Sequence, residues 1–578
     1  MPSFKLRKTL ENKAIILTLI ALDFIIKVIN FKKIRRLEME EKEKKRIKIP
    51  VPEEVLEKFL SWFDSNKRVA FFMALIFGVI THITMITETV MSQDGIWNSM
   101  QYSRAGDWEL SLGRWGIEFA QRLNNFIAVP SITTIMCIFF MAIAAVFLID
   151  IFGFKSKYSA AFTGIILVVS PCLTATMLYV YTTVAYCLDM LLTIMAIWFI
   201  YKFKYKKIGM LLATFFFAFA LSIYPSYMGV TIGLCIMLSI IELLKDDSKI
   251  KDVFVNIGKT VGVVLVGGIL YYVLTMVLQK IAGIDMASYL GANQLSISAI
   301  LASFGTGFIS TYKNFLQFFF TDKIVLNSNY SRQLWYAMFY VGLVLAYIIR
   351  VIKLKCDTKK EKILKIVLST GMLIALPFGL NIINIIAIGV EIYPLTGAQL
   401  VLMIPFAFAI FELKDVLNIS KWMMILGAIC ITGTYYLASN ASYSALKLTY
   451  NQAYSSTMRV LDRIENTEGY EKSMPLCLAG IIGNNNYPRT MNLYGYTIGE
   501  LANNTVFHGT YGGQIGTWYN YMRVFYGLDI NLCDHDTYYK LVTSDEYKEM
   551  EMFPSQNSIK IINGVVVVKL SEEPPLPY

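Results

Sequence analysis

Apolar residues in this chain gather in long runs that short polar connections separate. A helix of about 20 apolar residues crosses the hydrocarbon core of a bilayer, which is about 30 Å thick. By length and periodicity, the runs predict about eleven spanning helices. They lie near residues 69–90, 131–150, 159–178, 182–201, 208–223, 226–244, 258–278, 334–352, 365–389, 398–413 and 421–438. The pattern therefore predicts an α-helical polytopic membrane protein.

Lysine and arginine follow an alternating pattern in the connections between these runs. They occur in residues 1–68, 155–157, 202–207, 245–251, 350–365 and 414–421, whereas the short connections near 179–181, 224–225 and 390–397 contain none. Positively charged loops are retained in the cytoplasm. The alternation predicts a multi-pass protein of the cell membrane with residues 1–68 inside and residues 439–578 outside.

The N-terminal segment, 1–68, contains one ambiguous apolar stretch at 14–29. Asp23 and Lys27 interrupt this stretch, and it is short for a span. A helix lying in the inner interface therefore fits it better than a spanning helix does.

Two long outer loops, 91–130 and 279–333, interrupt the predicted transmembrane domain, 69–438. In the first, aromatic and apolar side chains at helical spacing predict one amphipathic surface helix, formed by Trp108, Leu112, Trp115, Phe119, Leu123 and Phe126. In the second, Leu295–Ile309 and Phe315–Phe320 are too short or too rich in glycine to span. They predict two interfacial or re-entrant helices.

The tail from 439 predicts a small extracytoplasmic α/β domain. Residues 440–466 read as a helix that continues from the last span, and Met474–Gly483 reads as a buried strand. Asn563 and Gly564 separate two β-branched runs, which predicts a hairpin with a type I′ turn. Cys477 and Cys533 are the two cysteines of this tail, and their spacing leaves a disulfide open.

Composition agrees with a membrane protein, since 56% of the residues are hydrophobic and 16% are charged. Much of the net charge of +11 lies in residues 1–68, which also contain several glutamates. In a membrane protein such basic flanks report orientation and contact with anionic lipid. Membrane lipid is therefore an expected partner, and nucleic acid is not.

Ionisable side chains concentrate just after the first predicted span, as Asp94, Arg104, Asp107, Glu109, Arg114 and Glu118. A hydroxyl that attacks an anomeric carbon needs a general base, and a departing lipid phosphate needs a cation beside it. Asp94 is the predicted catalytic base, because it stands alone between an apolar span and Gly95. Arg114, Arg104 and Trp115 are candidate substrate-binding residues, whereas Glu109, Glu118 and Arg122 fit solvated surface charges better.

Polar residues within or at the ends of the spans are further candidates, since ionisable groups at membrane depth are usually functional. They are Glu88, Asp189, Asn381, Asn384 and Glu391. Glu88 and Asp189 are predicted to bind substrate, with pairing inside the bundle as the alternative for both. Tyr179, Tyr181 and Tyr186 fit an interfacial aromatic belt.

Two groups of short motifs resemble bacterial Gtr-type glucosyltransferases. Ser92-Gln-Asp94 followed by Leu112-Gly-Arg114-Trp115 is similar to the first-loop signature of that family. Met552-Phe-Pro554, Ser558-Ile-Lys560 and the run Ile562–Leu570 are similar to its ending. The resemblance covers most of the chain from about residue 60.

This resemblance implies a GT-C fold, in which a catalytic acid lies in the first outer loop and a second long outer loop follows. By analogy Asp94 takes the catalytic acid position, and Arg114 contacts the donor phosphate. Gly95 stands where a second carboxylate often follows the first. Asp107 is therefore the candidate second acid, and a divalent cation stays open as a cofactor.

The expected function is transfer of a hexose, glucose in the first place, from a polyprenyl-phosphate donor to a cell-surface glycan outside the membrane. A polysaccharide polymerase is a close alternative. A lipid-sugar flippase or transporter would place paired charges near the bilayer midplane in repeated halves, and a receptor or assembly factor would tolerate replacement of the first-loop acids.

Overall fold

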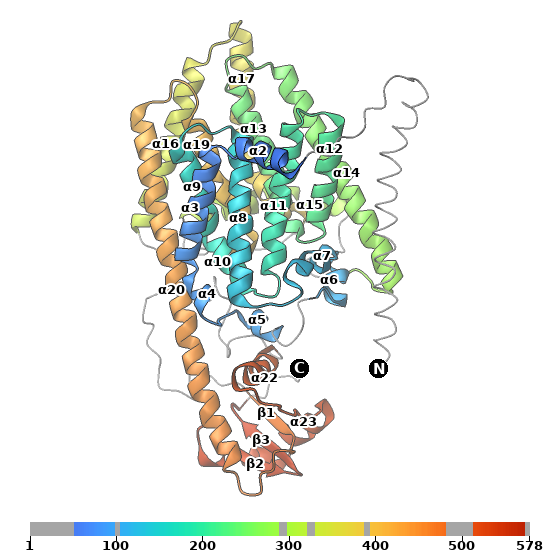
Figure 1. Ribbon diagram of the computed structural model, residues 1–578. Coiled ribbons are helices and arrows are strands. Elements are labelled where there is room, and N and C mark those ends of the chain that lie inside the picture. Colours follow the sequence, from blue (N-terminus) through green and yellow to red (C-terminus); the bar gives the residue numbers. More distant parts are fainter. Residues whose placement is uncertain are drawn as a thin grey trace. The chain divides into compact units, whose positions relative to one another are not determined.

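The computed structural model describes residues 51–98, 104–287, 297–320, 330–386, 394–480 and 513–572 (Figure 1). The predicted interfacial helix at 14–29 and the candidate Glu391 lie outside these residues. The chain divides into two compact units. Of the described residues, the smaller unit contains 51–64 and 277–285, and the larger contains all the others.

The described part of the smaller unit contains helix α2, Pro52–Trp62, and the C-terminal end of α14, Ile250–Ala282. Pro52 starts α2, where its missing N–H costs nothing. Glu53 and Glu54 follow in the first turn, where negative charge is favourable. Gly283, with φ of +71°, follows the end of α14.

The larger unit is mostly helical. Within the described ranges, eight helices are long and apolar enough to cross a membrane: Pro130–Phe152, Lys157–Leu178, Thr183–Lys202, Pro225–Leu243, Ile250–Ala282, Gln333–Lys353, Lys359–Leu380 and Asn418–Glu465. Two apolar helices are shorter, Lys207–Leu221 and Ala398–Phe411. These lengths and compositions support a helical membrane protein, and each of these helices overlaps a predicted span.

The first predicted span, 69–90, divides into two helices. α3, Ser65–Thr81, ends before His82, and α4 covers Ile83–Thr87. The buried His82 ring bonds to the Tyr443 hydroxyl and to the Val168 carbonyl, each at 2.7 Å. From Glu88 to Ser92 the chain is neither helix nor strand.

Close packing holds the helices of the larger unit together. α3 packs against α8 (Pro130–Phe152) and α9 (Lys157–Val169), and α11 (Thr183–Lys202) packs against α8 and α12 (Lys207–Leu221) (Figure 1). α13 (Met228–Leu243) contacts α17 (Lys359–Leu380), and α16 (Tyr330–Lys353) contacts α20 (Asn418–Glu465). A side chain at Gly164 would collide with the Ala70 carbonyl. Such small residues let two membrane helices approach closely.

The two long loops differ from their predictions. The first contains no single amphipathic helix in its described part but four short ones: α5 Gln93–Trp97, α6 Asp107–Ser111, α7 Gly116–Ala120 and η1 Gln121–Asn124. Gly113, with φ of +74°, breaks the helix between α6 and α7. In the second loop, α15 is one continuous helix over Ile297–Phe320. A glycine inside a helix costs only about 1 kcal/mol, so Gly305 and Gly307 do not end it.

The C-terminal part starts with α20, which continues without a break to Glu465, as the pattern predicted. A three-stranded sheet follows, in the order β1-β3-β2. β1 (Leu476–Ala479) runs parallel to β3 (Val565–Lys569), and β2 (Ile559–Ile562) pairs antiparallel with β3, with Ile562 opposite Val565. Asn563 and Gly564 both have positive φ, which confirms the predicted hairpin turn. Both faces of β3 are covered, which explains its uninterrupted run of valines.

Candidate functional site

Asp94 lies in the first turn of the short helix α5. The Ser92 side chain caps this helix by accepting the Gly95 N–H at 3.1 Å. The Ser92 N–H donates to the Leu178 carbonyl at 2.9 Å, which ties the loop to the end of α10, Pro171–Leu178. Local capping and one long-range hydrogen bond therefore place Asp94 beside the connection between α10 and α11.

Gly95 presses directly against this connection. A Cβ atom there would lie 2.8 Å from the Met91 Cβ and 3.1 Å from the Leu178 carbonyl oxygen. The structure therefore leaves no room for a side chain at this position unless its neighbours shift.

The Asp94 side chain is half-buried. Burial raises its pKa above the ordinary value, because desolvation penalises the ionised form. A carboxyl group with a raised pKa can take up a proton closer to neutral pH than an exposed one. This is the property that a general base requires.

Tyr181, between α10 and α11, interacts electrostatically with Asp94. Burial raises its pKa well above the ordinary value, and Tyr186, Asp94 and Glu109 add to the increase. Its hydroxyl therefore stays protonated at neutral pH and can donate a hydrogen bond. The sequence predicts Tyr181 as part of an interfacial aromatic belt rather than of the site. Tyrosines beside a loop without charged residues are the sequence signal that could have pointed to this group.

Glu109, predicted as a solvated surface charge, is half-exposed on α6. Its carboxylate accepts the Gly106 N–H at 2.7 Å, which caps α6, and it lies near enough to Tyr181 to affect the pKa of that residue. Asp107, the predicted second acid, is exposed at the first position of α6. Of these two acids, Glu109 is thus the one beside the tyrosines.

Arg114 lies over two stacked tyrosine rings. Its guanidinium is 5.1 Å from the centre of the Tyr224 ring and donates to the Tyr186 hydroxyl at 3.4 Å. The Tyr186 and Tyr224 rings stack at 4.3 Å. This cation–π contact and the hydrogen bond to Tyr186 hold the guanidinium at the loop, where it can bind an anion.

Two glycines position Arg114. At Gly113 a side chain would collide with the Tyr271 hydroxyl, and at Gly116 one would collide with Ser222. The Gly116 N–H donates to the Ser222 carbonyl at 2.8 Å. Trp115, between them, donates its indole N–H to Thr275 at 3.1 Å. The sequence Gly-Arg-Trp-Gly thus fastens the loop to α12 and α14.

Other predicted site residues lie apart from this group. Glu88 forms an exposed ion pair with Lys447, which favours the alternative of structural pairing. Arg104 is exposed, and its guanidinium lies 4.5 Å from the centre of the Phe126 ring.

Asp189 is fully buried one turn below Tyr186 on α11. Neither of its carboxylate oxygens has a hydrogen-bond partner among the residues described, although the Tyr224 backbone faces it. The alternative of an ion pair inside the bundle therefore finds no support there. A buried carboxylate without a cation is stable when it is protonated or when a ligand binds it.

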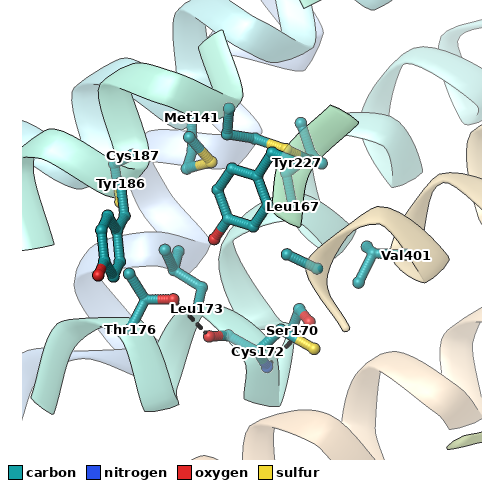
Figure 2. Close-up of a pocket in the computed structure, with 12 residues that line it drawn as sticks. Met141, Leu167, Ser170, Cys172, Leu173, Thr176, Tyr186, Cys187, Tyr227 and Val401 are labelled. Atoms are coloured by element: carbon teal, nitrogen blue, oxygen red, sulfur yellow. Dashed lines mark hydrogen bonds between the residues drawn. The ribbon is translucent and has the colours of Figure 1, made fainter. Parts of the chain in front are cut away.

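A small cavity lies beside Tyr186 in the helix bundle. Figure 2 shows Tyr227 and Tyr186 on its walls, with Ser170, Thr176 and Val401 around them. It leaves about 20 Å³ for the centre of a water molecule, enough for one water. Its walls are mostly apolar, and it is too small for a ligand much larger than water.

No group of three His, Cys, Asp or Glu residues in the described ranges is arranged to hold a metal ion. Asp94 and Glu109 are the two carboxylates near Tyr181. Mg²⁺ commonly binds through one or two carboxylates together with substrate phosphates. The site is therefore compatible with a cation that arrives with the donor.

Comparison with known proteins identifies the family. The family model described as "Glucosyl transferase GtrII" matches residues 84–404, which is more than half of the chain. No curated protein and no solved structure matches. The matched segment contains Asp94, Arg114 and the tyrosines around them, whereas α20 and the C-terminal sheet lie beyond it. The chain therefore belongs to the GtrII glucosyl transferase family.

Proposed function

We propose that this glucosyl transferase moves glucose from a polyprenyl-phosphate carrier to a cell-surface glycan on the outer face of the membrane. Asp94 acts as the general base. The observation that carries this proposal is the half-buried Asp94 carboxyl, with its raised pKa, in the same tyrosine group as Arg114.

In the proposed reaction the acceptor hydroxyl oxygen attacks the anomeric carbon of the donor. The new glycosidic bond forms as the bond between that carbon and the phosphate oxygen breaks. The hydroxyl proton passes to the Asp94 carboxylate, and the electron pair leaves with the polyprenyl phosphate. General base catalysis of this type contributes roughly 10²- to 10⁴-fold in rate.

Arg114 stabilises the phosphate as its negative charge grows. An arginine can donate two parallel hydrogen bonds to phosphate oxygens, with a geometry that a lysine lacks. The cation–π contact with Tyr224 and the hydrogen bond to Tyr186 position the guanidinium before the donor arrives. The protonated Tyr181 hydroxyl is a further donor for the phosphate or for a sugar hydroxyl.

The site's location supports a lipid-linked donor. A polyprenyl phosphate carries its sugar at headgroup depth, and the Asp94 loop directly follows α3 and α4, which occupy the first predicted span. The alternating loop charges predict that this end of the helices lies outside the cytoplasm, which supports the proposal.

The proposal is tested with purified protein in lipid nanodiscs and polyprenyl-phosphate-linked glucose, galactose and mannose. We expect transfer from the glucose donor, and we expect Asp94→Asn to lower kcat by about 10²- to 10⁴-fold with little change in donor binding. Arg114→Lys should raise the donor KM. Glu118→Gln, on α7 of the same loop, is the matched control and should keep its activity.

Full turnover by Asp94→Asn would remove Asp94 from the mechanism. Asp107→Asn separates the two predicted acids, because the exposed Asp107 should be replaceable if Asp94 acts alone. Product length distinguishes addition of one glucose from polymerisation.

A further inference from the structure

We infer that the C-terminal part of the chain holds Asp94 in place, with Tyr450 as the main positioning residue and Lys447 and Asn520 as its supports. These three residues lie beyond the segment that the family model matches. The inference rests on the proposed role of Asp94.

On the N-terminal side of Asp94, Tyr450 of α20 holds the irregular segment Glu88–Ser92. Its hydroxyl accepts the Met91 N–H at 3.2 Å and donates to the Met91 carbonyl at 3.0 Å. A hydroxyl can play both roles at once. One turn earlier on α20, Lys447 pairs with Glu88. Because this segment is neither helix nor strand, Tyr450 satisfies the Met91 backbone groups, and both contacts fix the course of the segment.

On the C-terminal side, α22 (Gly513–Tyr526) packs against α5 (Figure 1). The Asn520 side-chain amide donates to the Trp97 carbonyl at 2.7 Å. Met91 and Trp97 lie three residues before and three residues after Asp94. The C-terminal part therefore forms hydrogen bonds with the loop backbone both before and after Asp94.

α22 is itself anchored on α20. The Trp518 indole donates to Thr457 at 2.8 Å, and the Tyr521 hydroxyl donates to the Tyr450 carbonyl at 3.3 Å. The centre of the Tyr450 ring lies 5.8 Å from that of the Tyr521 ring and 5.4 Å from that of the Phe525 ring. Tyr450 thus contacts both the segment before Asp94 and α22, the helix that contacts the segment after it.

The physical need for this support comes from α5. A helix of five residues has no stability of its own, whereas a catalytic group must be held within about 0.5 Å of its working position. Leu178 supports α5 from the side of the bundle, and α20 and α22 support it from the C-terminal part. Tyr450 acts through the Met91 backbone and is therefore a positioning residue.

The test compares Tyr450→Phe with Tyr454→Phe. The first removes the hydroxyl that binds Met91 and keeps the buried ring. The second makes the same change at an exposed position of the same helix. We expect Tyr450→Phe to lower kcat by about 10- to 100-fold, as for a misplacement approaching 1 Å, with an almost unchanged donor KM. Tyr454→Phe should match the unmodified enzyme.

The pH profile distinguishes positioning from simple loss of stability. A loosened α5 exposes Asp94 to water, so its pKa falls and the acidic limb of kcat moves to lower pH. In the Asp94→Asn background, Tyr450→Phe should cause no further loss. Asn520→Ala, at the surface, repeats the test without disturbing the core.

Unchanged kcat and pH profile in both Tyr450→Phe and Asn520→Ala would overturn the inference. An equal further loss in the Asp94→Asn background would also overturn it, because Tyr450 would then act elsewhere. If Tyr450→Phe fails to fold, the Asn520→Ala result decides alone. Failure of the proposed function is distinct, because Asp94→Asn would then itself be fully active.

Discussion

At the scale of single residues, the chemistry depends on how the protein treats one carboxyl group. Asp94 is half-buried, and among the described residues no cation lowers its pKa, so its ionised form is disfavoured. Tyr181 interacts electrostatically with Asp94 and stays protonated at neutral pH. Arg114 lies over the Tyr224 ring and donates to the Tyr186 hydroxyl.

The raised pKa of Asp94 has a consequence for stability. The folded protein binds the Asp94 proton more tightly than the unfolded chain, so this contribution is full below the unfolded pKa of about 4. It is lost as pH rises through the folded pKa. Asp94→Asn cannot ionise, and we expect its Tm to exceed that of the unmodified protein at pH 8.

The Tm difference should shrink as the pH falls toward about 4, where the unmodified carboxyl is protonated in both states. Thermal unfolding of Asp94→Asn and of the unmodified protein in detergent, at several pH values, measures this Tm difference. A difference that stays constant over this range would mean that Asp94 is not buried as described. The acidic limb of kcat should report the same raised pKa, because activity needs the ionised base.

At the scale of elements, the path of the first loop depends on the glycines that interrupt its helices. Gly95, Gly113 and Gly116 bring the backbone into contact with neighbouring helices where a side chain would collide. These contacts turn a stretch with helical periodicity into short helices that present Asp94 and Arg114 to one group of tyrosines. Side-chain pattern predicted the surface character of the loop, but the glycine contacts decided its path.

Gly95→Ala tests this account of the loop. Its added methyl would meet the Met91 side chain and the Leu178 carbonyl, so α5 must shift. We expect a clear loss of kcat and a lower Tm. Gly371→Ala, inside α17 with open space around it, is the matched control and should be neutral or more stable by up to about 1 kcal/mol. Equal behaviour of the two variants would contradict the tight packing at Gly95.

At the scale of the whole molecule, two parts of the chain meet at the candidate site. The family segment supplies the proposed base and cation, and the C-terminal part grips the loop that carries the base. Both proposals require that the first loop and the C-terminal sheet lie on the same side of the membrane. The loop charges predict that this side is the outside.

Thiol labelling of intact cells tests this orientation. Leu123→Cys in the first loop and Tyr539→Cys in α23 (His535–Val542) place cysteines at exposed positions. We expect a membrane-impermeant reagent to label both, and to label Lys360→Cys, exposed at the start of α17, only after the cells are permeabilised. Labelling of Lys360→Cys alone in intact cells would reverse the orientation and remove access to an outer-face donor.

The features that could be predicted from the sequence are those that depend on residues close together in the chain. The thickness of a bilayer demands long apolar runs, so the positions of the long helices are readable from run length. The hairpin at Asn563 and Gly564 is likewise readable, because a type I′ turn depends on adjacent residues. The motif Leu112-Gly-Arg114-Trp115 could likewise be recognised from the sequence, because its residues are adjacent in the chain.

The tertiary structure decided the features that depend on residues far apart in the chain. It brought Glu109 rather than Asp107 beside the tyrosines, left Asp189 buried without a cation in the described bundle, and divided the first span at His82. It also placed Tyr450 against Met91, 359 positions away. Neither periodicity nor charge in one segment reports such contacts, because they arise from the packing of whole helices.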